Sequence, residues 1–214
     1  MQVDYANSSF VRLAGAVGKT QGADFDIFPM YGGMRRCNVS DDGTITAFYG
    51  DSTYIEDGSN GQVMVYVPKF YYSVIPLKRT PQETGIGYHM NKAIYYVTHN
   101  AKPGFKIHPA FIDRDGKEID YFLYSAYEGC AYDVSASNYF VYDEQSVDFS
   151  TDKLSSIANV KPMSGLSQQC TRPNVEAIAQ NRGAEWHGDL IKQTSAIQLL
   201  MVIEAGVMNT YTLS

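Results

Sequence analysis

Residues 62–77, QVMVYVPKFYYSVIPL, decide the fold class, because apolar, aromatic and β-branched side chains fill nearly the whole stretch. Pro68 and Pro76 interrupt it. Since proline cannot donate to a β-ladder, each belongs at an edge, a bulge or a strand break. AIYYVTH at residues 93–99 has the same character. The sequence therefore predicts a β-rich middle third of the chain.

Two turns built on Asp-Gly divide the predicted strands. Ser40-Asp41-Asp42-Gly43 separates two β-prone runs, residues 36–39 and 44–49. Asp-Gly is a strong hairpin signal because both turn positions tolerate positive φ. Asp113-Arg114-Asp115-Gly116-Lys117 predicts a second turn of this kind. The polar, glycine-bearing residues 50–61 mark the expected domain boundary.

Two helices are expected at the end of the chain. Thr171 is expected to cap the first helix, and Gly183 to stop it. Asp189 is expected to cap the second, which should run to about Ala205 before Gly206. We expect this second helix to be the central buried one, because it is apolar around much of its circumference. Its apolar positions are Leu190, Ile197, Leu200, Met201 and Ile203. Strands followed by helices predict an α+β fold.

Composition limits the function classes. A length of 214 residues suits one to two domains. The longest nearly apolar run, residues 196–203, falls short of the roughly 20 residues that a bilayer requires, so no membrane span is expected. Residues 1–10 lack a basic and an apolar signal region, so no secretory signal is expected. A net charge of −6 argues against a nucleic-acid partner, because neutralising phosphates needs clustered Lys and Arg.

The cysteines and tyrosines indicate a reduced, β-rich protein. Cys37, Cys130 and Cys170 are an odd number with no CxxC spacing, which predicts free thiols. The chain has 17 Tyr. Tyrosine is typical of β-rich cores and of adhesive surfaces, because its side chain is half apolar and half hydrogen-bonding.

Two motifs resemble ligand loops but fail on spacing. Residues 15–20, GAVGKT, suggest a phosphate loop, but Leu13 stands where the pattern needs glycine and no helical period follows. Asp113, Asp115 and Gly116 suggest a calcium loop. There the glycine comes too early and Tyr124 occupies the distal acidic position, so a hairpin turn is the better interpretation.

No catalytic, cofactor or metal residues are assigned. The four histidines lack the HxH or HExxH spacing of a zinc site, and no GxSxG motif is present. They are His89, His99, His108 and His187. No cofactor is expected, and an enzyme is the minor alternative.

Three residues are candidates for ligand binding, although the sequence leaves the site unknown. Trp186 and His187 lie between the two expected helices, where they could stack on a sugar or a peptide. A lone Trp at a helix junction is more often a plug for the core. Tyr72 is the third candidate, because the pair Tyr71-Tyr72 places one ring on each face of a strand.

Seven blocks spread over the chain carry a resemblance to known proteins. They are GKTQGADFDIFPMYGGMRRCNVSDDGTITAFYGD, EDGSNGQVMVYVPKFYY, GFKIHPAFI, GKEIDYFLYSAYEGC, KLSSIANVKPMSGL, TRPNVEAIAQNRGAEWH and AIQLLMVIEAGVMN. Together they resemble a family of bacteriophage and prophage tail-fibre or receptor-binding proteins from gut bacteria. Several members of that family are targets of diversity-generating retroelements.

The resemblance implies a fold and a domain division. Relatives have a C-type-lectin-like fold, shared with formylglycine-generating enzymes. By this resemblance, residues 1–61 are a β-hairpin attachment and oligomerisation segment, and residues 62–214 are the lectin-like domain. This chain stops about where relatives continue, so we expect it to lack the final ligand-binding segment, and no binding residue is carried over.

The resemblance also implies a non-enzymatic virion protein, made in the host cytoplasm and acting in host attachment or tail assembly. Its expected partners are other tail proteins, copies of itself in a homo-oligomer expected to be a trimer, and a bacterial surface glycan or protein. No nucleic acid and no membrane partner is expected.

Two alternatives stay open. One is a prophage- or bacterium-encoded lectin-like module that binds a glycan or a protein. The other is an enzyme of the formylglycine-generating type. The three cysteines match no motif of those enzymes, so the shared fold is interpreted as scaffold only.

Overall fold

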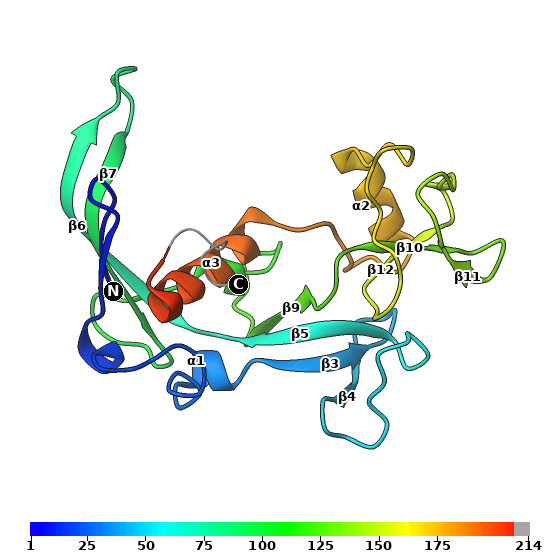
Figure 1. The fold of residues 1–214 in the computed structure, drawn as a ribbon, viewed down its shortest axis with the longest axis horizontal. Helices are drawn as coiled ribbons and strands as arrows, with labels where there is room; N and C mark the ends of the chain where they lie inside the picture. The colour runs from blue at the N-terminus through cyan, green and yellow to red at the C-terminus, as the bar shows by residue number, and fades with distance from the viewer. Residues whose placement is uncertain (208–214) are drawn as a thin grey trace. The chain divides into compact units, whose positions relative to one another are not determined.

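The computed structural model describes residues 1–207, an α+β fold with antiparallel strand pairing (Figure 1). Its strands are β1 (Gln2–Asp4), β2 (Ser9–Val11), β3 (Arg35–Val39), β4 (Ile45–Phe48), β5 (Gln62–Pro68), β6 (Tyr71–Pro81), β7 (Tyr88–Thr98), β8 (Lys106–Ile107), β9 (Tyr121–Ser125), β10 (Cys130–Asp133), β11 (Asn138–Tyr139) and β12 (Lys153–Ser155). Its helices are α1 (Pro29–Gly32), α2 (Arg172–Gln180) and α3 (Ile191–Ala205), with 3₁₀ turns η1 (Ala14–Ala16) and η2 (Pro109–Phe111). Among the described residues, no helix has the length and apolar character to cross a bilayer.

The chain forms two compact units, each built from separate stretches. Unit 1 comprises Met1–Met34, Pro68–Phe122 and the C-terminal stretch from Ile191; unit 2 comprises Arg35–Val67 and Leu123–Leu190. The sequence-based division into residues 1–61 and 62–214 stays a prediction, because compact packing does not test an attachment role.

Unit 1 is organised on a five-stranded sheet of order β2-β1-β7-β6-β8. Strands β6 and β7 pair from Tyr71↔Thr98 to Pro81↔Tyr88 and form a long hairpin (Figure 1). The β-rich middle third is confirmed, including its interruptions. Pro68 ends β5, and Pro76 lies at a register shift within β6.

Helix α3 packs against η2 and β7 within unit 1. The expected central buried helix is buried in part, because only one face is fully buried and Ile191 is exposed. The buried face carries Gln193, Ala196, Leu200 and Ile203. These positions follow a spacing of three and four residues, which puts them on one stripe.

The ends of α3 match the sequence in part. The helix ends at Ala205 as expected, followed by Gly206 at φ +70°, whose amide donates to the Val202 carbonyl at 3.0 Å. Its start differs from the expectation. The helix begins at Ile191, two residues after Asp189, whose carboxylate accepts a hydrogen bond from the Tyr124 hydroxyl at 3.1 Å. A capping role for Asp189 stays a prediction.

Unit 2 contains the strands β4-β3-β5, continued by β9, and a second sheet of order β11-β10-β12. The hairpin predicted around Asp42-Gly43 is confirmed, since β3 and β4 pair antiparallel. Gly43 has φ +84°, and its amide donates to the Ser40 carbonyl at 2.9 Å. The second Asp-Gly turn is also present in unit 1, where the Asp113 amide donates to the Lys117 carbonyl at 2.9 Å.

Helix α2 of unit 2 ends earlier than the sequence indicated. Thr171 occupies the N-cap position in an extended conformation, but its side chain makes no capping hydrogen bond. The helix ends at Gln180, three residues before Gly183, so the predicted stop is wrong. Gly183 has a different role: a Cβ there would lie 2.4 Å from the Asp41 carbonyl oxygen, so only glycine allows this close approach.

Candidate ligand-binding pocket

Unit 1 contains an open pocket of about 740 Å³, within the size range of small-molecule sites. Three parts of unit 1 form most of its wall: residues 25–31, the end of β7 with the loop to Phe105, and Ile203 of α3. All of these stretches belong to the same compact unit. The pocket is therefore a feature of one unit alone.

The apolar wall is an aromatic cluster on and before α1. The rings of Phe25 and Tyr31 meet edge to face with centroids 5.1 Å apart, and Phe28 lies 5.9 Å from Phe25. Pro29 fits the first turn of α1, because that position needs no amide donor. Gly32 ends the helix, where a Cβ would lie 1.9 Å from the Asp26 carbonyl oxygen. Glycine thus allows the tight return that holds the rings together.

Two pocket-lining tyrosines, the buried Tyr31 and the half-buried Tyr95, are held in the neutral state. The Tyr31 hydroxyl donates to the Leu200 carbonyl at 3.1 Å, which ties the aromatic wall to α3. Burial raises the pKa of Tyr31 well above its usual range. Tyr95 of β7 shares a hydrogen bond of 2.5 Å with the Tyr5 hydroxyl, and burial likewise raises its pKa. Both phenols stay protonated at neutral pH and act as structural supports.

The polar wall comes from β6, β7 and the following loop. Ser73, Thr98, His99 and Lys102 line the pocket there. Among the described residues, none of these four side chains makes a hydrogen bond or an ion pair. No acidic side chain of the described chain lines the pocket. The arrangement can hold an apolar body and offer donors to a polar group.

Tyr72 lies in unit 1 but is not a lining residue. It sits in β6, and its ring centroid is 5.0 Å from that of His108. His108 is buried, and its Nδ1 accepts a hydrogen bond from the Ala110 amide at 3.2 Å. Burial lowers the pKa of His108 to about 4, so the ring is neutral at pH 7. Tyr72 therefore packs beside a structural histidine.

Trp186 and His187 belong to unit 2. Trp186 packs against the core cluster of Cys37, Val39 and Met64. Its Nε1 donates to the Asp41 carbonyl at 2.8 Å. This arrangement matches the interpretation of a core plug. Nδ1 of His187 lies 2.7 Å from the Gly188 carbonyl oxygen. Since Tyr72 lies in the other unit, the structure assigns the three sequence candidates to two units.

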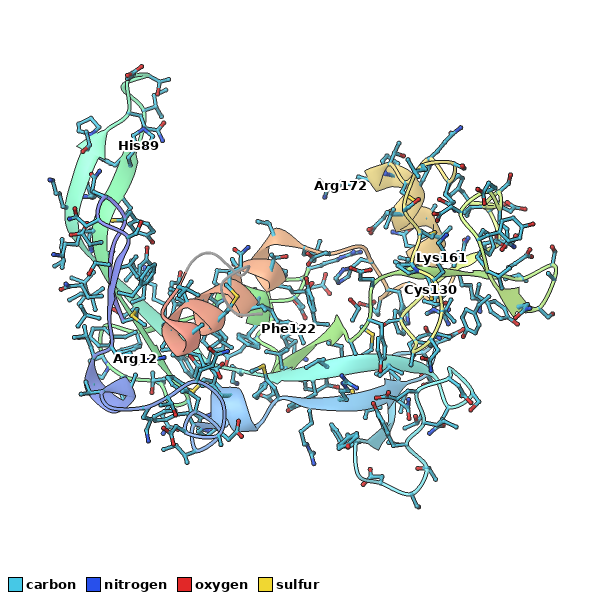
Figure 2. All side chains as sticks on the ribbon, in the orientation of Figure 1. Arg12, His89, Phe122, Cys130, Lys161 and Arg172 are labelled. Atoms are coloured by element: carbon cyan, nitrogen blue, oxygen red, sulfur yellow. The ribbon has the colours of Figure 1, made fainter. Side chains whose placement is uncertain are left out.

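The cysteines are free thiols, as the sequence predicted. Cys37 and Cys130 are buried, and burial raises the pKa of each to about 11. Burial also raises the pKa of Cys170. Figure 2 labels Cys130 at β10, and His89 on the outer part of the β6–β7 hairpin. Within residues 1–207, no group of three or more His, Cys, Asp or Glu side chains comes together in a way that could hold a metal ion.

Sequence patterns did not indicate the pocket. Its lining residues come from stretches far apart in the chain, and only the spacing of Phe25, Phe28 and Tyr31 offered a local signal of a shared face. Gly15, noted for a resemblance to a phosphate loop, lines this pocket beside Phe28. We found no match to this chain among protein-family models, curated proteins or solved structures.

Proposed function

We propose that the chain is a non-enzymatic component of a phage virion, a tail-fibre or receptor-binding protein that acts in host attachment or tail assembly. The structural observation that carries the proposal is the exposed apolar surface of the β6–β7 hairpin. Leu77, Ile86 and Tyr88 are 48%, 81% and 59% exposed. Exposed apolar side chains grouped on one element are typical of protein–protein contact surfaces.

The outer part of this hairpin has no strand partner in the described chain. β8 pairs only with Tyr71 and Tyr72 at its base, and β1 pairs only with residues 92–94 of β7. A two-stranded hairpin is marginal by itself in water, since it buries little apolar surface. A partner that covers it would stabilise it.

A second copy of the chain is the partner we propose. The outer hairpin carries Lys78 and Arg79 against one carboxylate, Glu83, whereas the whole chain has a net charge of −6. Another copy therefore offers complementary charge. Pro76 and the register shifts around Lys78 disfavour edge-to-edge strand pairing. The contact would form through side-chain packing, and symmetric copies would add avidity to weak attachment contacts.

A C-type-lectin-like fold for residues 62–214 is part of this proposal. The antiparallel sheets and the two late helices support it. The buried cysteines support a non-enzymatic role, because thiols with a pKa of about 11 hold little thiolate at neutral pH. The aromatic pocket favours the alternative of a prophage- or bacterium-encoded lectin-like module that binds a glycan or a protein. A glycan array tests that alternative.

Sedimentation velocity tests the assembly role. We expect the chain to associate at micromolar concentration, and a Leu77→Glu, Ile86→Glu double variant to sediment as a monomer. A Val141→Glu, Leu166→Glu variant is the matched control, because both side chains are exposed and lie outside the hairpin. A strict monomer for the original chain, or association unchanged in the hairpin variant, would contradict the proposal.

A further inference from the structure

The pocket of unit 1 has two chemically distinct sides. Phe25, Phe28 and Met30 give an apolar side, while Thr98, His99 and Lys102 give a polar side within five consecutive positions of the chain. Pockets for small molecules commonly combine a large apolar wall with a few placed polar groups. The two sides therefore suit a ligand that has an apolar body and one polar end.

The charge of the lining is opposite to that of the chain. The sequence has 23 Asp and Glu against 17 Lys and Arg, yet none of these carboxylates is among the described lining residues. Lys102 supplies a cation to the lining. An acidic protein thus carries a pocket whose charge complements an anion.

Two further cationic side chains lie over rings of the aromatic wall. The Arg12 guanidinium lies 5.7 Å from the Phe25 ring centroid, and Lys19 Nζ lies 5.8 Å from that of Phe28. Arg12 Nε is buried and has no hydrogen-bond acceptor among the described residues. The carboxylates of Asp24 and Glu204 accept hydrogen bonds from Thr20 and Gly22 and do not line the pocket.

From this complementarity we infer that the pocket binds an amphipathic anion: a molecule with an aromatic or aliphatic body and a single carboxylate or sulfonate group. The body packs on the rings of residues 25–31. The anionic group accepts hydrogen bonds from Lys102 and the hydroxyls of Thr98 and Ser73, which have no other partner among the described residues. This inference does not depend on the proposed virion role.

A pair of fluorescent probes tests the charge preference. 1-Anilinonaphthalene-8-sulfonate carries a sulfonate, and N-phenyl-1-naphthylamine has nearly the same body without it. We expect saturable binding of the sulfonate at one site per chain. Its affinity should exceed that of the neutral probe by about fivefold, the size of one partly exposed ion pair. Equal affinity for the two probes would overturn the anion preference.

Substitutions of lysine residues test where in the pocket the anionic group of the ligand binds. Lys102→Gln should lower the binding affinity for the sulfonate probe about fivefold and leave the affinity for the neutral probe unchanged. Lys106→Gln is the matched control, since Lys106 is also exposed but does not line the pocket. Equal effects of the two substitutions would overturn the assignment of Lys102.

Substitutions in β6 test the site itself. Ser73 lines the pocket and its neighbour Val74 does not, because adjacent strand residues face opposite sides. Ser73→Phe should fill the pocket and abolish binding of both probes, whereas Val74→Phe should leave both unchanged. Circular dichroism shows that each variant is folded. Full binding in a folded Ser73→Phe variant would overturn the inference.

Discussion

Arg182 is a buried cation of unit 2, and each of its nitrogens has an acceptor. Nε donates to the Leu154 carbonyl at 2.7 Å, Nη1 to the Asp41 carboxylate at 2.5 Å, and Nη2 to the Ser155 hydroxyl at 2.6 Å. Its side chain is only 5% exposed, and its guanidinium lies 5.6 Å from the Trp186 ring centroid. These contacts fix Trp186 as part of a packed core, which explains why a residue considered for ligand stacking is used structurally.

His108 gives a residue-scale prediction about pH. Its folded pKa is lowered to about 4 from an ordinary value of 6.5, because burial disfavours the imidazolium. Between these values the unfolded chain binds a proton that the folded chain excludes. The contribution to the free energy of unfolding is therefore full above pH 6.5 and is lost as the pH falls through 4, by up to about 3 kcal/mol.

The measurement compares the chain with a His108→Asn variant in urea unfolding at pH 7, 5.5 and 4. Asparagine keeps an acceptor for the Ala110 amide but does not titrate. We expect the original chain to be the more stable at pH 7, and this advantage to shrink as the pH falls. An advantage that stays constant over that range would show that His108 does not titrate as argued.

At the scale of elements, Gly61 directly precedes β5, and its backbone conformation allows the chain to turn into that strand. It has φ +103°, a left-handed conformation that side chains rarely adopt, and a Cβ there would lie 2.4 Å from the Val39 carbonyl oxygen of β3. Gly43, in the β3–β4 turn, has φ +84° with open space around it. Both glycines have a left-handed backbone, but a Cβ would clash with neighbouring backbone only at Gly61.

We expect Gly43→Ala to lower the free energy of unfolding by about 1 kcal/mol, the cost of the left-handed backbone alone. Gly61→Ala should lower it by about 3 kcal/mol or more, because the clash with backbone adds to that strain. Urea unfolding of both variants measures the difference. Equal losses would mean that β3 and β5 separate easily to admit a methyl group.

The elements that the sequence predicted well are those determined locally. The Asp-Gly pairs predicted both turns, Pro76 predicted an irregularity in β6, and Gly206 predicted the end of α3. The missed features depend on distant contacts. Gly183 is needed where its backbone approaches Asp41 and not as the end of α2, and no local pattern reports such an approach. The pocket was not predicted either, because its lining also depends on contacts between distant parts of the chain.

At the scale of the whole molecule, the chain leaves and re-enters each compact unit. Met1–Met34 shares unit 1 with the stretch from Ile191, and Arg35–Val67 shares unit 2 with Leu123–Leu190. A glycine-rich stretch in the sequence can suggest a linear boundary, but it cannot reveal such interleaving. A β-rich N-terminal segment was nevertheless expected, and β1 to β4 all lie before residue 61.

The virion role is the central claim. Electron microscopy of phage particles from the organism that encodes this chain, labelled with an antibody against it, tests that role most directly. Our account predicts label at the tail, with symmetric copies on each particle. Particles that carry their other tail proteins and yet show no label, with the chain recovered only from particle-free material, would contradict it.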